Sequence, residues 1–407
     1  MRKPLLFGAT GFALGAAIAV LATQVVWPAV TAPDGREPGA LVLMTGTDES
    51  IGQQRLALID QWNAMHPENP VTVKQLPATA DAARSQMVAQ AQSGEEQVDV
   101  YNLDVVLTPE FADAGFITPL EDVDTTGFLA KPLSTCRYRD QLWALPFNTD
   151  AGLLFYRTDL VQQQPRTWRQ LRNAIRDGKP ADMPIGLATQ LGDYEGGAVT
   201  ITEAVQADGG KLVDDGEVVI DSPAAQDALT ELAEDVRDAD INLAASLEAN
   251  ERSSTQAFGN GEAMFLRNWP IAYRELTGKN IPFGVMELPG PSVLGGQNLA
   301  IAARSANKGA ARELIEFLTS PRSQQLLFER GGLAATRGIV YQDPTILNEY
   351  PYAGSLLKAV EEAEPRPVGP HYTRFSETLR DVVRQMLVEG ELPPDYLERL
   401  DRAWKGR

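Results

Sequence analysis

The fold is decided by residues 40–76, which read ALVLMTGTDESIGQQRLALIDQWNAMHPENPVTVKQL. Residues 40–44 are an apolar run typical of a short strand, and Ser50 is a good N-cap for the helix that the apolar spacing of residues 51–65 predicts. After a turn that contains Pro and Asn, residues 71–76 alternate as a second strand. A strand, a helix and a strand in this order form a βαβ unit, which implies a parallel sheet.

Short apolar runs, separated by Gly, Pro and amphipathic segments, continue along the chain. The runs that predict strands are residues 98–103, 143–147, 153–156, 184–189, 263–266, 283–286 and 299–302. Among the predicted helices, one begins with Thr167 and Gln170 in the pattern of a capping box, and a longer one begins at Ser222 with Pro in the next position. The sequence therefore predicts a large α/β protein with more than one sheet.

The composition excludes several classes of function. The chain has 407 residues, enough for two or three domains of roughly 100 to 200 residues each, and 36 basic against 55 acidic residues give a net charge of −19. This charge repels phosphate backbones, so we expect no nucleic-acid partner. With one cysteine, Cys136, and two histidines, His66 and His371, the chain has no material for a disulfide or a Cys- or His-rich metal site, and we expect no cofactor.

The amino terminus has the pattern of an export segment. Arg2 and Lys3 precede an uncharged, mostly apolar run over residues 5–26, followed by small residues suitable for cleavage. The run is also long enough to span a bilayer, so an uncleaved membrane anchor remains an equal alternative. A lipoprotein signal would need a cysteine at the cleavage point, and Cys136 lies far downstream. In either case we expect the rest of the chain, after a linker at residues 31–38, to lie outside the cytoplasm.

Several motifs, read in order, resemble a known family. They are LIDQWN at 58–63 before HP at 66–67, VDV at 98–100 with FADAGFITPL at 111–120, YRDQLWALPF at 138–147, DAGLLFYR at 150–157, PRTW at 165–168, and FGNGEAMFLRNWP at 258–270 with LPGP at 288–291. Together they resemble the extracellular solute-binding proteins of ABC importers, in particular the carbohydrate-binding group that includes maltose- and trehalose-binding proteins. The likeness runs from about residue 41 to the end.

The resemblance implies a two-lobed α/β fold of the periplasmic-binding-protein type (type II), with a sugar bound in a cleft between lobes that are joined by a hinge of crossing segments. The chain would cross near residues 149–153, return near 281–285 and cross again around 319–325. The implied parts are residues 1–37 as signal peptide or membrane anchor with its linker, 38–149 and 283–322 as the two parts of lobe 1, and 150–282 and 323–407 as the two parts of lobe 2.

A sugar site needs aromatic platforms, together with carboxylates and amides that bond to hydroxyls. In the first lobe, the candidates after the early strands are Asp48, Glu49 and Asp104, although the first two lie at a predicted helix start and could equally serve as N-cap or dipole partners. Asn148 and Asp150 lie beside the first crossover, where the family places polar ligand contacts. A structural role in the hinge turn is the alternative for these two residues, and it is compatible with binding.

Candidates in the rest of the chain also follow from the resemblance. Tyr194 and Glu195 are similar to the Tyr-Glu-Gly of trehalose-type members, and Trp269, after a predicted strand, is placed to stack on a pyranose unless it only packs the second lobe. Gln297 stands where many relatives have a tryptophan, so one stacking platform is missing. Arg374 resembles a late arginine that reaches the cleft in some relatives, with a solvated surface position as the alternative.

These expectations favour a monomeric binding protein that closes over a sugar, most simply a di- or oligosaccharide, and delivers it to the permease subunits of an ABC transporter. A sensor that presents its closed form to a membrane receptor is an alternative that the sequence does not separate from import. A secreted glycoside hydrolase, with carboxylates such as Glu49 and Asp104 as acid and base, is a third possibility that no spacing supports. We therefore expect a binding protein and not an enzyme.

Overall fold

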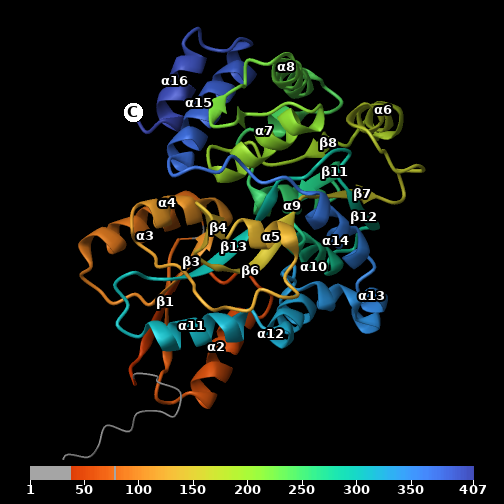
Figure 1. Ribbon diagram of the computed structural model, residues 1–407. Helices are drawn as coiled ribbons and strands as arrows, with labels where there is room; N and C mark the ends of the chain where they lie inside the picture. The colour runs from red at the N-terminus through yellow and green to blue at the C-terminus, as the bar shows by residue number, and fades with distance from the viewer. Residues whose placement is uncertain (1–37, 78) are drawn as a thin grey trace, which may run out of the picture. The chain divides into compact units, whose positions relative to one another are not determined.

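A computed structural model of the protein describes residues 38–77 and 79–407 (Figure 1). The predicted export segment and nearly all of the linker lie outside these residues. Two separate sheets, each covered by helices, form the framework of the described part. No helix there combines the length and the apolar character needed to cross a membrane.

The first sheet contains the predicted βαβ unit. Its strands, in spatial order, are β2 (Val71–Gln75), β1 (Leu41–Thr45), β3 (Val100–Asp104), β13 (Leu294–Ile301) and β6 (Leu145–Ala151). β1 pairs in parallel with β2 and with β3, which confirms the parallel arrangement that residues 40–76 predict. β13, which comes late in the chain, inserts antiparallel between β3 and β6.

Helices cover both faces of this sheet. They are α2 (Gln54–Met65) and α11 (Lys308–Leu318) on one face and α3 (Ala80–Ser93) and α4 (Thr108–Asp113) on the other, with α5 (Ala130–Ser134) and α12 (Pro321–Leu326) nearby. The periodic apolar positions of α2 supply one core, and Trp62 is buried there with its indole N–H donating to the Asn69 carbonyl at 2.8 Å. The two cores hold the sheet rigid, so its strand ends can position side chains accurately.

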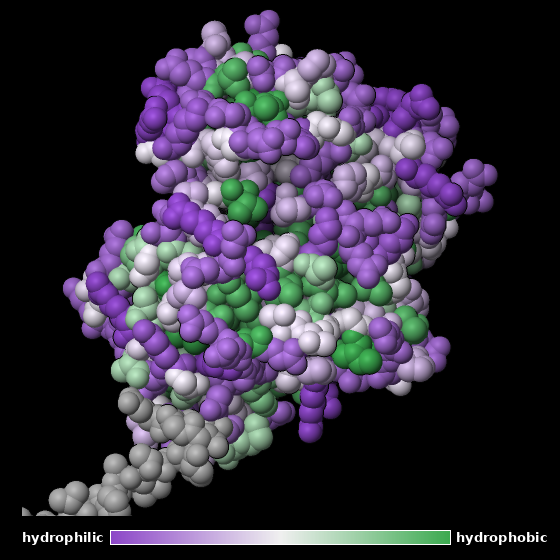
Figure 2. All heavy atoms as spheres, in the orientation of Figure 1, coloured by the Kyte–Doolittle hydropathy of each residue, from purple (hydrophilic) through white to green (hydrophobic). Residues whose placement is uncertain are grey.

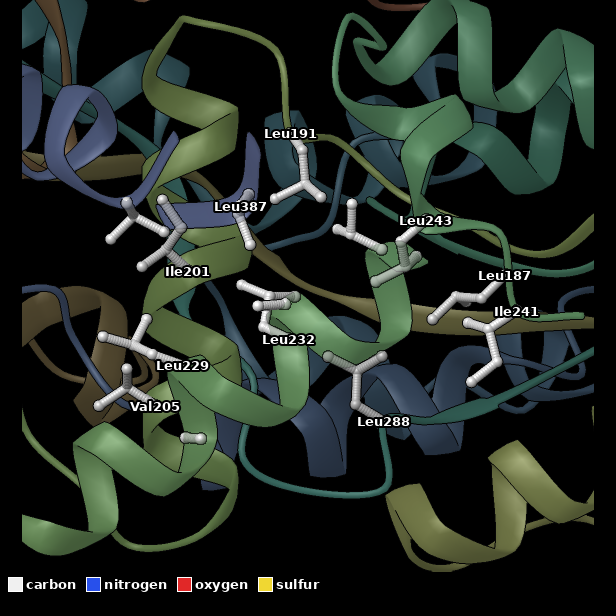
Figure 3. Close-up of a cluster of buried hydrophobic side chains, with 14 of the residues drawn as sticks. Leu187, Leu191, Ile201, Val205, Leu229, Leu232, Ile241, Leu243, Leu288 and Leu387 are labelled. Carbon is white, nitrogen blue, oxygen red and sulfur yellow. The ribbon is translucent and has the colours of Figure 1, made fainter. Parts of the chain in front are cut away.

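The second sheet consists, in order, of β12 (Phe283–Glu287), β7 (Leu153–Arg157), β11 (Ala263–Asn268) and β8 (Ile185–Ala188). Its helices are α6 (Trp168–Gly178), α7 (Glu195–Ala207), α8 (Pro223–Arg237), α15 (Tyr372–Glu389) and α16 (Tyr396–Trp404), and on the other face α9 (Glu251–Gly259), α10 (Ile271–Thr277), α13 (Pro344–Glu349) and α14 (Ala353–Glu362). Figure 3 shows how Ile201 and Val205 of α7 interleave with Leu229 and Leu232 of α8 in the larger core. We refer to each sheet with its helices as the first and the second lobe.

The chain passes from the first lobe to the second where β6 ends and β7 begins, at Gly152. A Cβ on Gly152 would lie 2.8 Å from both the Glu203 carboxylate and the Arg267 guanidinium, so only glycine fits this crossing. The predicted boundary at residue 283 falls at the start of β12, which pairs along its whole length with β7 in the second sheet. The return to the first lobe therefore comes after Glu287, between β12 and β13.

The predicted capping box at the start of α6 is only half formed. The Thr167 hydroxyl accepts a hydrogen bond from the Gln170 amide at 3.2 Å, as predicted. The Gln170 side chain, however, accepts from the amide of Arg166 at 2.8 Å instead of that of Thr167. The glutamine still satisfies a backbone donor before the helix, so the local stabilisation is similar.

Small hairpins complete the described structure: β4 (Arg137–Tyr138) with β5 (Gln141–Leu142), and β9 (Val213–Asp214) with β10 (Glu217–Val218). Figure 2 shows one face, where hydrophilic residues predominate and hydrophobic ones gather in smaller patches. This agrees with the strongly acidic composition.

Candidate functional site

Four of the predicted site residues lie side by side at one end of the first sheet. In the strand register, Gln297 of β13 lies opposite Asp104 of β3 on one side and opposite Asn148 of β6 on the other. Two residues away, Asp150 lies opposite Gly295. Residues from three different parts of the sequence thus meet because β13 inserts between β3 and β6.

Asp150 has few hydrogen-bond partners for a carboxylate. The Asn148 side-chain amide donates to its Oδ2 over a long 3.3 Å. Burial, followed by the nearby carboxylates of Glu49 and Asp104, raises the pKa of Asp150 to about 8, and the positive charge of Arg267 only partly opposes this. At neutral pH this carboxyl group therefore holds a proton for most of the time.

Asp48 and Glu49, in the loop after β1, have different roles. The Asp48 carboxylate accepts from the amide of Ser50 at 3.1 Å, from its hydroxyl at 2.6 Å, and from the amide of Leu56 at 3.2 Å, so it orders the loop and the start of α2. Part of the Glu49 side chain is exposed, yet loss of hydration and the nearby carboxylate of Glu251 raise its pKa. Of the two, Glu49 is the one that faces charges of the second lobe.

The second lobe contributes Trp269, the residue after β11. Its indole N–H donates to one oxygen of Glu251 at 3.3 Å, and the Tyr194 hydroxyl donates to the other oxygen at 2.8 Å. A Cβ on Gly295 would lie 3.2 Å from the indole Cη2 and 3.2 Å from the Cβ of Asp150. The absence of a side chain at Gly295 therefore lets Trp269 of the second lobe approach Asp150 of the first.

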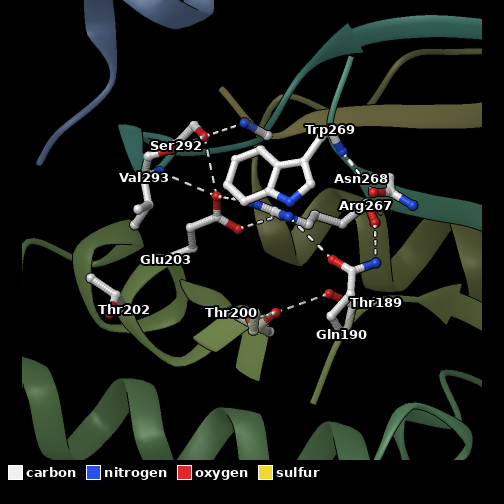
Figure 4. A network of polar contacts seen from close by, with 12 residues as sticks. Thr189, Gln190, Thr200, Thr202, Glu203, Arg267, Asn268, Trp269, Ser292 and Val293 are labelled. Atoms are coloured by element: carbon white, nitrogen blue, oxygen red, sulfur yellow. Dashed lines mark hydrogen bonds and ion pairs between the residues drawn. The ribbon is translucent and has the colours of Figure 1, made fainter. Parts of the chain in front are cut away.

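A buried ion pair fixes one face of this tryptophan (Figure 4). The Arg267 guanidinium lies 4.0 Å from the centre of the Trp269 ring and donates to both oxygens of Glu203, at 2.6 and 2.7 Å. Gln190 accepts a further bond from Arg267 at 3.1 Å, and the amide of Val293 donates to Glu203 at 3.1 Å. Since the guanidinium occupies one face of the indole, only the other face is left for stacking.

Glu195 lies in a second network, which connects the lobes through Arg366. Its carboxylate accepts from Arg366, from the Tyr372 hydroxyl and from the Ser376 hydroxyl, each at 2.6 Å. The same Arg366 donates to Asp104 of the first lobe at 2.8 Å and is 4% exposed. Glu195 is thus heavily engaged within the protein. Arg366 joins the lobes, and so does Arg380 of α15, which lies 3.6 Å from Asp81 of the first lobe and 3.6 Å from Glu195.

The predicted arginine, Arg374, is exposed on α15. The arginine that reaches the junction is Arg366, eight residues earlier, in a segment before the helix where sequence periodicity gives no orientation. Glu251, which holds both Trp269 and Tyr194, was also missed. Its position at the first residue of α9 favoured a helix-dipole role, and nothing in its sequence neighbourhood connects it with a residue 18 positions later.

The structure gives little support to a metal site or to a ligand site inside the second lobe. Among residues 38–77 and 79–407, no group of three or more His, Cys, Asp or Glu is arranged to hold a metal ion. A cavity of about 50 Å³ lies inside the second lobe, lined in part by Trp168, Ala204 and Leu232. Ligand pockets usually measure about 300 to 1,000 Å³, so this cavity is too small for a sugar. The acidic and aromatic cluster at the junction of the lobes is the candidate site.

A family model for bacterial extracellular solute-binding proteins matches residues 46–325, more than half of the chain. The chain belongs to this family. A probable ABC transporter-binding protein of Deinococcus radiodurans is 28% identical over 88% of this chain and 92% of its own length. The maltotriose-binding protein of Pyrococcus abyssi is 25% identical over 77% of this chain and 70% of its own length.

Solved structures show the same fold. The maltose-bound MalE3 protein of T. maritima superposes with a TM-score of 0.82 at 28% identity, covering 90% of this chain and 99% of its own. The GacH receptor of Streptomyces glaucescens superposes with a TM-score of 0.78 at 22% identity, covering 90% of this chain and 98% of its own, and supports the fold alone. The predicted two-lobed α/β fold of a solute-binding protein is therefore confirmed, and the family is one of binding proteins and not of enzymes.

Proposed function

We propose that this family member binds a carbohydrate at the junction of its two lobes, outside the cytoplasm, and delivers it to the permease of an ABC transporter. The observation that carries the proposal is the meeting of the Trp269 indole with the carboxylates of Asp150 and Glu251 at that junction. A sugar ring has an apolar face for the indole and hydroxyls for the carboxylates. The names of two relatives, a maltotriose-binding and a maltose-bound protein, support the same ligand class.

Binding would couple to closure of the lobes. Asp150 belongs to the first lobe and Trp269 to the second, so a ligand that contacts both binds more tightly when the lobes are together. Such a ligand shifts the population toward the closed form, which the permease would then recognise. Small-angle scattering of the monomeric protein should show a smaller radius of gyration with saturating ligand than without it.

The direct test uses the protein produced without residues 1–37. Calorimetric titration with maltose, maltotriose, trehalose and cellobiose should give saturable binding of at least one sugar, and chromatography of the mixture should return that sugar intact. The matched control is Asp227→Asn, which removes one exposed carboxylate of α8 and should not alter binding. Absence of binding by every carbohydrate tested, including longer oligosaccharides, would refute the proposed ligand class, and release of shorter sugars would refute a purely binding role.

A further inference from the structure

The candidate site holds more acidic side chains than its own cations pair with, and part of the charge is removed only because Asp150 holds a proton. Three carboxylates face the junction without an ion pair to any Lys or Arg in the described part of the chain: Glu49, Asp150 and Glu251. Glu251 raises the pKa of Glu49, and Glu49 raises that of Asp150, so the three charges lie within each other's field. Placing like charges together in a partly dehydrated site is unfavourable unless something compensates them.

Of the arginines near these groups, Arg55 lowers the pKa of Glu49 but donates to the Gly46 carbonyl at 2.7 Å, and the other two are already engaged in ion pairs. Arg366 is shared between Asp104 and Glu195, and Arg267 forms a bidentate pair with Glu203 while its flat face covers Trp269. In both cases the guanidinium is almost fully buried and fixed by several bonds. Neither arginine is therefore able to turn toward the three unpaired carboxylates without leaving a buried carboxylate uncompensated.

A second and independent observation points to a missing hydrogen-bond donor. Asn148 is 3% exposed, and while its amide NH₂ donates to Asp150, its Oδ1 is buried with no hydrogen-bond partner among the described residues. A buried acceptor left unsatisfied costs roughly 1 to 3 kcal/mol, and a donor from a ligand or an ordered water would remove this cost. The orphan oxygen belongs to the same amide that contacts Asp150, so the missing donor is needed next to a carboxyl group that has no ion pair.

Among the groups that a carbohydrate carries, the protonated amine supplies both a hydrogen-bond donor and a positive charge. A hydroxyl donates one hydrogen bond and brings no charge, whereas an ammonium group donates three hydrogen bonds and brings one positive charge. A charge-assisted bond to a carboxylate is also roughly twice as strong as a neutral one. A metal ion would neutralise the charge but donates no hydrogen bond. The described residues also contain no group of three or more His, Cys, Asp or Glu arranged to hold one.

We propose that the ligand is an amino sugar, bound with its protonated amine between Asp150 and the Asn148 Oδ1 and with its ring on the free face of Trp269. This inference rests on the proposed carbohydrate function and specifies the substrate class of the same site. The two groups lie close together, because Asp150 Cβ and the Trp269 indole are both 3.2 Å from the point that a Cβ on Gly295 would occupy, so one sugar unit that enters as the lobes separate could contact both. The amine and the ring face would then belong to one sugar unit.

The test compares matched ligands on the protein without residues 1–37. Maltose, trehalose and cellobiose are titrated as the parent sugars, with one hydroxyl replaced by an amine at C2, C4 or C6 in turn, and with the same amine acetylated. At least one amine form should bind ten times or more tighter than both its parent and its acetylated form. If parent sugars bind and no amine form exceeds them, the inference is wrong while the carbohydrate function stands. If no form of any sugar binds, both fail.

Variants locate the amine. Asp150→Asn should reduce the preference for the amine form over the parent sugar at least tenfold, while Asp227→Asn, the exposed control with the same change in net charge, should leave it unaltered. A preference that survives in Asp150→Asn would overturn the placement. A variant that failed to fold would be recognised by its circular dichroism, and Asn148→Asp, which adds a carboxylate at the orphan acceptor, should then raise the preference instead.

Measuring proton release distinguishes an amine bound at Asp150 from a merely structural role of this residue. At pH 6.5 Asp150 is largely protonated, since Glu49, Asp104 and burial outweigh Arg267, so an arriving ammonium group should displace its proton. Calorimetry in two buffers of different ionisation enthalpy should show release of up to one proton with the amine form and none with the parent sugar. Equal proton counts for the two ligands would contradict an amine at Asp150.

Discussion

Replacing Asp150 by Asn should make the ligand-free protein more stable in alkaline solution and leave it nearly unchanged in acid. The folded protein holds the Asp150 proton with a pKa of about 8, against a usual value of 3.8. Since the folded state binds this proton more tightly than the unfolded state does, the free energy of unfolding falls as pH rises through the window between the two values. Asparagine is neutral at every pH, so the free energy of unfolding of the variant does not fall in this way.

The magnitude follows from the width of the window. A difference of about four pKa units, at about 1.4 kcal/mol per unit, sets a ceiling of about 6 kcal/mol above pH 8. Part of the side chain is accessible to solvent, which screens the charge, so we expect roughly half of the ceiling, or about 3 kcal/mol. At pH 5 only about one of the four units of the window has been crossed, so the variant should exceed the wild type by about 1 kcal/mol or less, and the two should agree only below pH 3.8, where both states hold the proton.

The assay is urea denaturation at pH 5, 7 and 9, because urea leaves electrostatic interactions unscreened. Burial also raises the pKa values of Glu49 and Asp104, so the informative quantity is the difference in stability between the variant and the wild type at each pH. Asp227→Asn, on the exposed side of α8, should show no difference that changes with pH. A variant that is less stable than the wild type at pH 9, or offset equally at every pH, would refute the reasoning.

Three further substitutions test the rest of the site. Trp269→Ala should weaken sugar binding about tenfold or more, because an aromatic contact contributes roughly 0.5 to 1.5 kcal/mol beyond the area it buries, and an unchanged dissociation constant in a less stable protein would mean that the indole only packs. Arg366→Ala removes the cation that Asp104 and the buried Glu195 share and leaves Glu195 only with Arg380 at 3.6 Å, so it should cost about 3 kcal/mol of stability, visible as a lower melting temperature in thermal denaturation; an unaltered temperature would contradict the bridging role. Gly152→Ala places a methyl group 2.8 Å from the buried ion pair and should lower the free energy of unfolding in urea by about 1 to 3 kcal/mol. Gly309→Ala, whose added methyl group would have nothing within 4 Å, should be neutral or stabilising. Equal effects of the two substitutions would count against a tight crossing at Gly152.

The parts of the fold that local patterns determine could be predicted from the sequence. The βαβ unit over residues 40–76 has an apolar strand, a helix and a second strand within one continuous stretch, and β1, α2 and β2 form there. The helix begins at Gln54, with Gln53 and not the predicted Ser50 at the N-cap position, although the Ser50 hydroxyl still accepts from the Gln54 amide at 2.8 Å. The partner of each later strand could not be predicted in the same way. β12 and β13 are both short apolar strands separated by Gly and Pro, yet one joins the second sheet and the other inserts into the first, because pairing depends on contacts distant in sequence.

The candidate site also has a part that could be predicted from the sequence and a part that could not. Asp104 ends β3, and Asn148 and Asp150 lie within β6 next to the crossing at Gly152, so their convergence could be expected once the strands were placed in a two-lobed fold. Arg366 could not, because it contacts carboxylates 262 and 171 positions away and lies in a segment with no periodic pattern. A partner at such a distance leaves no trace in local spacing, and only the folded arrangement shows which of the many arginines it is.

The distinction between paired and unpaired carboxylates explains how one acidic junction can serve two purposes. Where a guanidinium bridges two carboxylates, as Arg366 does between Asp104 and Glu195, the charges are compensated inside the protein and the contact holds the lobes together. Where no cation pairs directly with the carboxyl group, as at Asp150, the compensation comes from a bound proton, and a ligand could take its place. The first arrangement fixes how the two lobes meet, and the second leaves free energy available for the proposed ligand. A ligand that replaces the proton by its own positive charge would therefore stabilise the closed form without breaking the contacts of Arg366.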